Sequence, residues 1–360
     1  MNPQNERSGI TKLAGLIKTE ARGLKKKINI MEICGTHTMA ISRFGLRSML
    51  PGRINLISGP GCPVCVTPIK EIDRAIETAG VDNVIITTFG DMMRVPGTRS
   101  SLAAEKAKGK DIRIVYSPVD ALDTAKKNPD KNVVFMGIGF ETTSPLIAVT
   151  VKQAKAEKIK NFFVQAAFKT IIPPMEALLN DKDLNLHGFI APGHVSAITG
   201  GKVYEYITHK YGVPCVISGF EAMDILKTIL MIINQVKAGE GKVEIQYTRA
   251  VKYEGNLTAQ AVLKEVFEEV GSNWRGIGGI PMSGLDFNGD YSEFSAKNKF
   301  RIDISYSKEP KGCLCGEVLK GAAKPDECGL FGKDCTPENP IGACMVSSEG
   351  TCAAYYKYER

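Results

Sequence analysis

The chain has 360 residues, enough for two or three domains, and its 43% hydrophobic content is ordinary for a globular protein. The net charge of +7 is modest for this length, and the basic run at residues 22–27 is typical of a solvated helix face, so we expect no nucleic-acid binding. No apolar run approaches the roughly 18 residues of a membrane-spanning helix, and the first residues lack the apolar region of a secretory signal, so we expect no membrane association.

From residue 28 to about residue 239, short apolar runs alternate with amphipathic stretches. The apolar runs predict eight strands, at residues 28–33, 54–57, 84–88, 112–116, 133–138, 162–166, 188–191 and 214–217. Helical patterns lie between most of them, for example at residues 68–79, 119–127, 145–158 and 220–238. Strands that alternate with helices predict an α/β fold with parallel sheets built from right-handed crossover units.

We expect these strands to form two parallel-sheet α/β domains, residues 1–130 and residues 131–240, divided near the polar stretch NPDKN at residues 128–132. After residue 239 the alternation stops. A strand is predicted over residues 242–253, a helix over residues 258–270 and a glycine-rich loop over residues 276–284. Residues 241–360 therefore predict a third, smaller domain that depends on a metal or an iron–sulfur cluster for its stability.

Nearly every predicted strand runs into a glycine-rich or polar motif. The carboxyl ends of strands line the ligand crevice of an open α/β sheet, so we expect these motifs to gather at one edge of each domain and to share a cleft between the domains. The motifs are CGTHT at residues 34–38, GPGCPVC at residues 59–65, GFETT at residues 139–143 and APGHVS at residues 191–196.

The first motif places Cys34 and His37 three residues apart, just past a strand. A thiolate and an imidazole at this spacing can share one metal, or the imidazole can lower the pKa of the thiol and make it a nucleophile. The alternative is a buried cysteine beside a helix that Thr36 caps, with His37 on the surface.

The second motif places Cys62 and Cys65 in a C-x-x-C sequence that opens a helix beginning near Pro68. The start of a helix stabilises a thiolate, and this spacing suits a reversible disulfide. The same pair would otherwise be half of a zinc site completed by Cys34 and His37.

Glu141 is expected at a strand-to-helix turn, where a carboxylate can pair with a cation, position a partner or act as a base. Thr142 or Thr143 would cap the helix that follows, which does not exclude a function for Glu141. His194 also lies at the end of a predicted strand, which makes a role in the site as plausible as a structural one. Cys215 lies inside an apolar run and is expected to be a core residue without chemistry.

Six cysteines gather in the last forty-eight residues. We expect a cytoplasmic protein, whose thiols mostly stay reduced, so these cysteines indicate metal or redox chemistry rather than structural disulfides. Structural zinc usually binds closely spaced C-x2-C pairs, whereas the close pair is Cys313-x-Cys315. The wide spacing C-x14-C-x6-C-x16-C predicts a [4Fe–4S] cluster. Its ligands would be Cys313, Cys328, Cys335 and Cys352, leaving Cys315 and Cys344 as a possible redox pair.

The four motifs and the cysteine tail, in this order, resemble one family, the hydrogenase maturation protein HypD. The resemblance runs from residue 34 to residue 352 and so covers nearly the whole chain. It implies a scaffold on which the Fe(CN)2(CO) unit of [NiFe] hydrogenase is assembled, rather than a free-standing turnover enzyme. The scaffold would be a monomer that forms complexes with a HypC-type chaperone, which contributes a cysteine, and with a HypE-type donor of cyanide.

The resemblance also implies roles for single residues. Cys34 would bind the transient iron that carries CN and CO ligands, with His37 beside it. Cys62 and Cys65 would be a redox-active pair in the same cleft. The four cluster ligands would be those named above, and Cys315 with Cys344 would form a dithiol or disulfide near the cluster, in an arrangement similar to ferredoxin–thioredoxin reductase.

Two other functions are compatible with the motifs. One is an iron–sulfur thiol–disulfide oxidoreductase that reduces partner disulfides at Cys62 and Cys65. The other is a zinc-stabilised binding module without a redox role. Purification without oxygen separates these alternatives, because a cluster makes the protein brown and zinc leaves it colourless.

Overall fold

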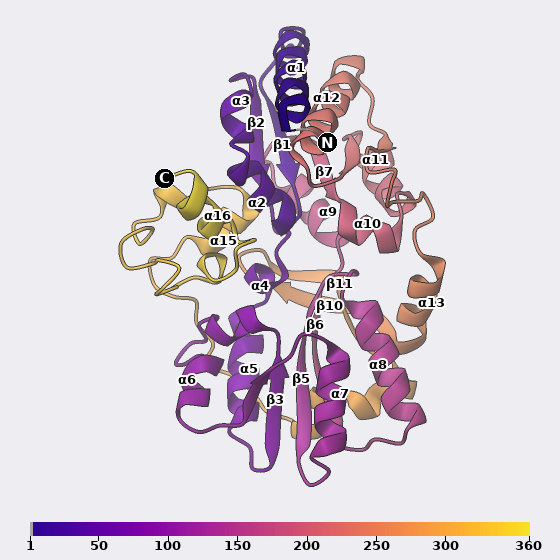
Figure 1. The fold of residues 1–360 in the computed structure, drawn as a ribbon, viewed down its shortest axis with the longest axis vertical. Coiled ribbons are helices and arrows are strands. Elements are labelled where there is room, and N and C mark those ends of the chain that lie inside the picture. Colours follow the sequence, from indigo (N-terminus) through magenta and orange to yellow (C-terminus); the bar gives the residue numbers. More distant parts are fainter. Residues whose placement is uncertain (1–2) are drawn as a thin grey trace.

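A computed structural model describes residues 3–360, and two parallel β-sheets form its frame (Figure 1). The larger, sheet A, has five strands in the order β2 (Ile54–Ser58), β1 (Ile28–Glu32), β7 (Leu186–Pro192), β8 (Cys215–Ser218) and β9 (Val243–Ile245). The smaller, sheet B, has four strands in the order β4 (Ile112–Ile114), β3 (Val84–Thr88), β5 (Asn132–Gly139) and β6 (Phe162–Phe168). The strand pairings within both sheets are parallel, which confirms the α/β class.

Helices surround both sheets. In chain order they are α1 (Pro3–Ala21), α2 (Gly35–Arg43), α3 (Leu46–Met49), α4 (Pro63–Val66), α5 (Ile69–Ala79), α6 (Leu102–Ala107), α7 (Pro118–Lys127), α8 (Ser144–Ala156), α9 (Ile172–Asn180), α10 (Gly193–Thr199), α11 (Glu205–Tyr211), α12 (Ala222–Ala238), α13 (Leu257–Val266), α14 (Ala296–Phe300), α15 (Cys315–Lys320) and α16 (Thr351–Tyr358). Short 3-10 turns are η1 (Gly90–Arg94), η2 (Lys202–Tyr204), η3 (Gly289–Phe294), η4 (Pro325–Glu327) and η5 (Ala343–Met345).

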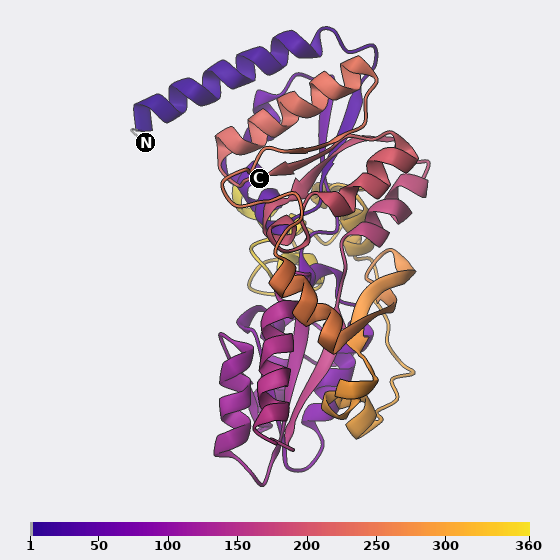
Figure 2. The same ribbon diagram turned by 90° about the vertical axis from the view of Figure 1, so that its right-hand side faces the viewer.

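Helix α12 shows how the sequence pattern produces this packing. Its isoleucines at positions 225, 229 and 232 recur at helical spacing, and all three are fully buried in a core shared with β1 and α1. Figure 2 shows α1 and α12 lying side by side over sheet A. Among residues 3–360, no helix combines the length and the apolar character needed to cross a bilayer.

The two sheets do not divide the chain near residues 128–132, as the sequence predicted. The chain begins sheet A with β1 and β2, builds all of sheet B with β3 to β6, and returns to sheet A for β7 to β9. The expected boundary therefore falls inside sheet B, just before β5. The apolar strands have similar compositions, so the sequence did not reveal which of them are neighbours.

Three expectations for residues after 239 are also corrected. The strand expected over residues 242–253 is the three-residue β9, and it belongs to sheet A. The helix expected over residues 258–270 ends at Val266, and the glycine-rich stretch is mostly strand. Residues 267–287 form an antiparallel hairpin of β10 (Phe267–Trp274) and β11 (Gly278–Phe287). The reason is tertiary: Phe267 packs against Phe168 of β6 and Phe287 of β11, at centroid distances of 5.2 and 5.0 Å.

The cysteine-rich segment at the end of the chain packs against the frame. Its own apolar cluster is small and consists of Cys335, Met345 and Ala353. Cys315 and Cys344 belong instead to the largest core of the protein, together with residues of both sheets. In Figure 1, α15 and α16 lie beside α2 and α4. The CGTHT motif runs into the first turn of α2, and the GPGCPVC motif runs into α4.

A pair of glycines tests the contact between the hairpin and this segment. Gly276 and Gly278 both have positive φ, but only at Gly276 would a Cβ collide with backbone, 2.3 Å from the Cα of Gly316 in α15. We predict that Gly278→Ala costs about 1 kcal/mol, the strain of a left-handed alanine. Gly276→Ala should cost at least about 2 kcal/mol more, because the collision adds overpacking. Urea unfolding of both variants measures the difference, and equal losses would contradict the contact.

Candidate functional site

Cys34 begins the helix that follows the first strand of sheet A. It occupies the N-cap position of α2 with extended backbone, and its side chain is 8% exposed. Burial raises the pKa of the thiol to about 12, although the backbone N–H groups of His37 and Thr36 act in the opposite direction. The isolated site therefore holds a neutral thiol. Thr36 does not cap the helix, because its hydroxyl donates to Glu349 Oε1 at 2.7 Å.

Glu32, which the sequence analysis missed, fixes this loop from the end of β1. Its carboxylate is fully buried and accepts from the backbone N–H of Cys34 at 3.0 Å and from the hydroxyl of Thr38 at 2.6 Å. Burial raises the pKa of Glu32 to about 6, while these hydrogen bonds lower it. The available signal was a lone acidic residue inside the apolar run INIMEI.

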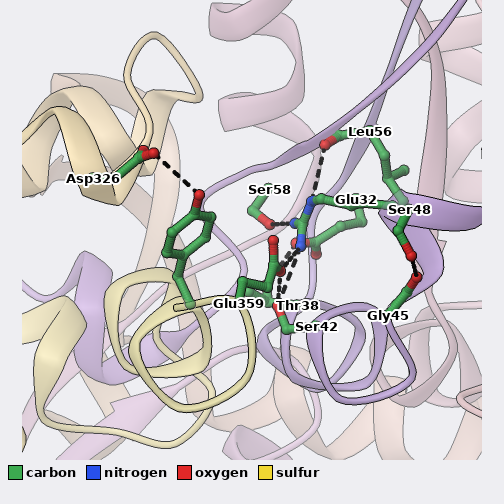
Figure 3. A network of polar contacts seen from close by, with 11 residues as sticks. Glu32, Thr38, Ser42, Gly45, Ser48, Leu56, Ser58, Asp326 and Glu359 are labelled. Carbon is green, nitrogen blue, oxygen red and sulfur yellow. Dashed lines mark hydrogen bonds and ion pairs between the residues drawn. The ribbon is translucent and has the colours of Figure 1, made fainter. Parts of the chain in front are cut away.

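A polar network links the same region to the last helix, α16. Arg47 donates to Glu359, which also accepts from Ser42 of α2 at 2.6 Å, and to Ser58 at the end of β2 at 2.8 Å. Figure 3 shows Ser42, Ser58 and Glu359 together with Glu32. Burial raises the pKa of Glu32, and the nearby Ser58 and Arg47 offset part of that rise. The network ties the C-terminal segment to the helix that carries Cys34.

The two candidate histidines lie against one aromatic ring. Phe220, which follows β8, packs against His37 and His194 at centroid distances of 4.8 and 4.0 Å. His37 is fully buried, so it does not lie on the surface, and burial lowers its pKa to about 4. Its Nε2 lies 3.0 Å from the carbonyl oxygen of Gly219 and must donate to it, because a carbonyl only accepts. Nδ1 is then an acceptor, and it has no partner among the described residues.

The C-x-x-C pair lies in direct contact with the Cys34 loop. A Cβ on Gly61 would lie 2.1 Å from the backbone nitrogen of Cys34, so the two loops touch through their main chains. Cys62 and Cys65 are both buried, and Cys62 Sγ accepts from the N–H of Cys65 at 3.4 Å.

The pair does not open the long helix that was expected near Pro68. Cys62 caps the separate four-residue helix α4, and α5 begins only at Ile69. Burial raises the pKa of Cys65 well above its usual range. The expected stabilisation of a thiolate at a helix start is therefore outweighed by desolvation.

All six C-terminal cysteines line one small pocket. The other residues of its wall are apolar or glycine, namely Leu314, Val318, Leu330, Phe331, Gly342 and Met345. Cys315 Sγ and Cys344 Sγ are 3.0 Å apart, and both residues are buried. The pocket lies next to the C-x-x-C pair, because Cys65 Sγ is 4.0 Å from the carbonyl oxygen of Ala343, which precedes Cys344 of the pocket wall.

The chemistry of these thiols is that of iron–sulfur cluster ligands. Among residues 3–360, no three His, Cys, Asp or Glu side chains are placed to hold one metal ion together. A cubane spaces its four thiolates more widely, since four irons and four sulfides lie between them. Converging thiols in an apolar pocket fit such a group.

The remaining candidates lie apart from the thiols. Cys215 is fully buried in the core, as expected for a residue without chemistry. Glu141 follows β5 at the predicted turn, but its carboxylate faces a separate pocket and accepts from the N–H of Ile171 at 2.9 Å. Thr143 is the N-cap residue of α8, without a capping hydrogen bond from its side chain. The structure therefore places Glu141 at a pocket whose wall contains no cysteine.

Comparisons with known proteins identify the family of this chain. Residues 8–359 match the family HypD, described as "Hydrogenase formation hypA family". The chain is 47% identical over 354 residues to the hydrogenase maturation factor HypD of Rhodobacter capsulatus, which covers 97% of this chain and 93% of that protein. It is 47% identical over 337 residues to HypD of Escherichia coli, covering 93% and 90%, and 44% identical over 359 residues to HypD of Cupriavidus necator, covering 97% and 94%. The chain therefore belongs to the HypD family.

Proposed function

We propose that this protein acts in hydrogenase maturation as the scaffold on which the Fe(CN)2(CO) unit is assembled. The observation that carries the proposal is the contact between three thiol-bearing segments. Gly61 touches the backbone of Cys34, and Cys65 touches the segment that carries Cys344. Cys34, the C-x-x-C pair and the Cys315–Cys344 pair thus lie on three segments that contact one another in turn.

The iron would be bound as cargo at Cys34. A thiolate is a soft ligand that suits iron carrying cyanide and carbon monoxide. The unpartnered Nδ1 of His37 is an acceptor in the same loop, which supports a role for His37 beside the iron. Cys34 is the only cysteine of its loop, which is compatible with a HypC-type chaperone that contributes a second thiol.

The buried thiols would supply electrons for cyanide attachment. Release of cyanide from a thiocyanate on a HypE-type donor takes up two electrons and one proton and returns the donor's cysteine as a thiol. Oxidation of two thiols to one disulfide provides two electrons and two protons. The separation of 3.0 Å between Cys315 Sγ and Cys344 Sγ means that little movement is needed to form that bond.

Cys313, Cys328, Cys335 and Cys352 would hold a [4Fe–4S] cluster in the apolar pocket that they line. When bound, this group supplies or accepts electrons one at a time. The lining of the pocket supports the assignment, because all of its residues other than the cysteines are apolar or glycine.

Burial argues against the alternative of a free thiol–disulfide oxidoreductase. Cys65 is fully buried and Cys62 is 4% exposed, so a disulfide on a partner cannot reach them in this conformation. Infrared spectroscopy on protein co-purified with its chaperone separates the two functions. Bands from bound cyanide and carbon monoxide support the scaffold, and their absence from a cluster-loaded complex supports the oxidoreductase.

We predict that Cys34→Ala abolishes the cyanide and carbonyl bands of the purified complex, because the iron loses its ligand in this chain. The visible absorbance of the C-terminal cluster should persist, since Cys34 does not line that pocket. Cys215→Ala, another buried cysteine, is the control and should retain the bands. Full hydrogenase maturation by the Cys34 variant would contradict the assignment.

Cys328→Ala or Cys335→Ala should lose most of the bound iron and acid-labile sulfide, because a cubane needs four ligands. Residues after about 300 should also become more sensitive to protease. Iron and sulfide analysis with limited proteolysis tests both effects against Cys215→Ala. Unchanged iron and sulfide in either variant would remove that cysteine from the ligand set.

We also predict that Cys62 and Cys65 form a reversible disulfide that exchanges with Cys315 and Cys344. Attack of one dithiol on the other pair's disulfide returns one disulfide and two thiols, so the exchange is balanced. Reduction of an oxidised Cys62–Cys65 pair should slow at least about tenfold in the Cys315→Ser/Cys344→Ser variant. Thiol labelling after anaerobic reduction measures this. Identical rates would exclude the exchange, and a failure to form the disulfide at all would favour metal ligation by this pair.

A further inference from the structure

A second pocket lies at the junction of the two sheets and contains no cysteine. Its volume is about 610 Å³, within the range of small-ligand sites. Figure 1 shows α9, α13 and the β10–β11 hairpin meeting in this region. Much of its wall is apolar, formed by Ile172, Pro173, Val203, Leu263, Phe267, Met282 and Leu285.

One buried oxygen on this wall lacks a hydrogen-bond donor. Glu141 is 8% exposed; its Oε1 accepts from the N–H of Ile171, but its Oε2 has no partner among the described residues. A buried carboxylate oxygen without a donor is energetically costly, and such atoms are rare in folded proteins. Burial is the main reason that the pKa of Glu141 rises to about 7.

The neutral polar side chains of the pocket wall already have hydrogen-bond partners. The hydroxyl of Thr170 donates to the carbonyl of Met282 at 3.2 Å, and the hydroxyl of Thr199 donates to that of Val195 at 3.2 Å. The amide of Gln260 donates to the carbonyls of Ile198 and Glu254, both at 2.8 Å. Among the buried polar atoms that the structure describes on this wall, Glu141 Oε2 is therefore the one that lacks a hydrogen-bond donor.

The charges and the apolar lining of the pocket indicate which kind of ligand could donate a hydrogen bond to Glu141. A second carboxylate, Glu269 of β10, lies on the same wall and disfavours the charged form of Glu141, and Lys264 of α13 is the basic residue of the wall. A cation would relieve the repulsion between the two carboxylates, and a neutral donor would not. The apolar wall suits an aliphatic stem, and Met282, which is 53% exposed, adds an adaptable side chain.

We propose that this pocket binds an organic cation, an ammonium or guanidinium group on an aliphatic stem, with Glu141 Oε2 as its hydrogen-bond acceptor. A free alkylamine and a lysine or arginine side chain of a partner protein share this chemistry. The site is independent of the iron scaffold, because neither Cys34 nor any other cysteine lines it.

The test uses the full chain and a matched pair of probes, N-butylguanidinium and the neutral N-butylurea. Binding is followed by NMR of methionine methyl groups labelled with carbon-13, with the Met282 signal assigned from Met282→Leu. We expect the cation to bind at least about tenfold more tightly than the urea and to shift the Met282 signal. Equal affinities for the two probes would overturn the proposal even if no variant folds. A Met282 signal that does not move on addition of the cation would also overturn it.

Two variants then locate the acceptor. Glu141→Gln keeps an acceptor for the N–H of Ile171 but removes the charge, and it should abolish the preference for the cation. Glu269→Gln removes the other carboxylate of the wall and should weaken binding less. An equal or larger loss in the Glu269 variant would overturn the role of Glu141.

A second pair of probes distinguishes the two sources of the cation. A blocked pentapeptide with a central arginine is compared with its citrulline counterpart, which is neutral and nearly isosteric. Preferential binding of the arginine peptide supports a side chain of a partner protein as the natural occupant. Binding of N-butylguanidinium without binding of the arginine peptide supports a free amine. Both measurements use purified protein without iron or partners, so their failure would leave the scaffold function untouched.

Discussion

The close approach of Gly61 to the main chain at Cys34 is the constraint on which the thiol site depends. The two loops leave no space for a side chain between them, and Gly35, on the other side of Cys34, packs against Glu349 in the same way. The Cys34 loop is therefore held between the C-x-x-C motif and the C-terminal segment. Gly35 and Glu349, more than 300 residues apart in sequence, thus meet at a contact that leaves no room for a Cβ on residue 35.

Burial sets the protonation states within this arrangement. It raises the pKa of Cys34 and Cys65 and lowers that of His37, so both thiols and the imidazole are neutral near pH 7. A neutral thiol is a weak nucleophile. It loses its proton when a metal ion displaces that proton or when a neighbouring thiolate accepts it. Burial thus keeps the thiols of Cys34 and Cys65 protonated until a metal ion or a neighbouring thiolate becomes their partner.

The sequence predicted this site better than it predicted the fold around it. The rule that strand ends carry functional residues correctly joined Cys34 with Cys62 and Cys65, because both motifs follow neighbouring strands of sheet A. The same rule failed for Glu141, because β5 belongs to sheet B and its end faces another pocket. Phe220 was missed because its partners His37 and His194 are distant from it in sequence. Glu32 was missed because the sequence pattern does not show that a carboxylate within an apolar strand accepts hydrogen bonds from the loop that follows. The hairpin was missed because the packing of Phe267 outweighs a helical pattern.

The interleaved order of the strands sets the order in which the two sheets can form while the chain is being synthesised on the ribosome. Sheet B comes from one continuous stretch, residues 84–168, so its pairings need only short loop closures and can form early. Strand β1, in contrast, must wait for β7, which is synthesised about 150 residues later. During that interval β1 has an open edge and Cys34 lacks its surroundings. The nascent chain thus leaves the thiol of Cys34 exposed until β7 and the C-terminal segment have been synthesised.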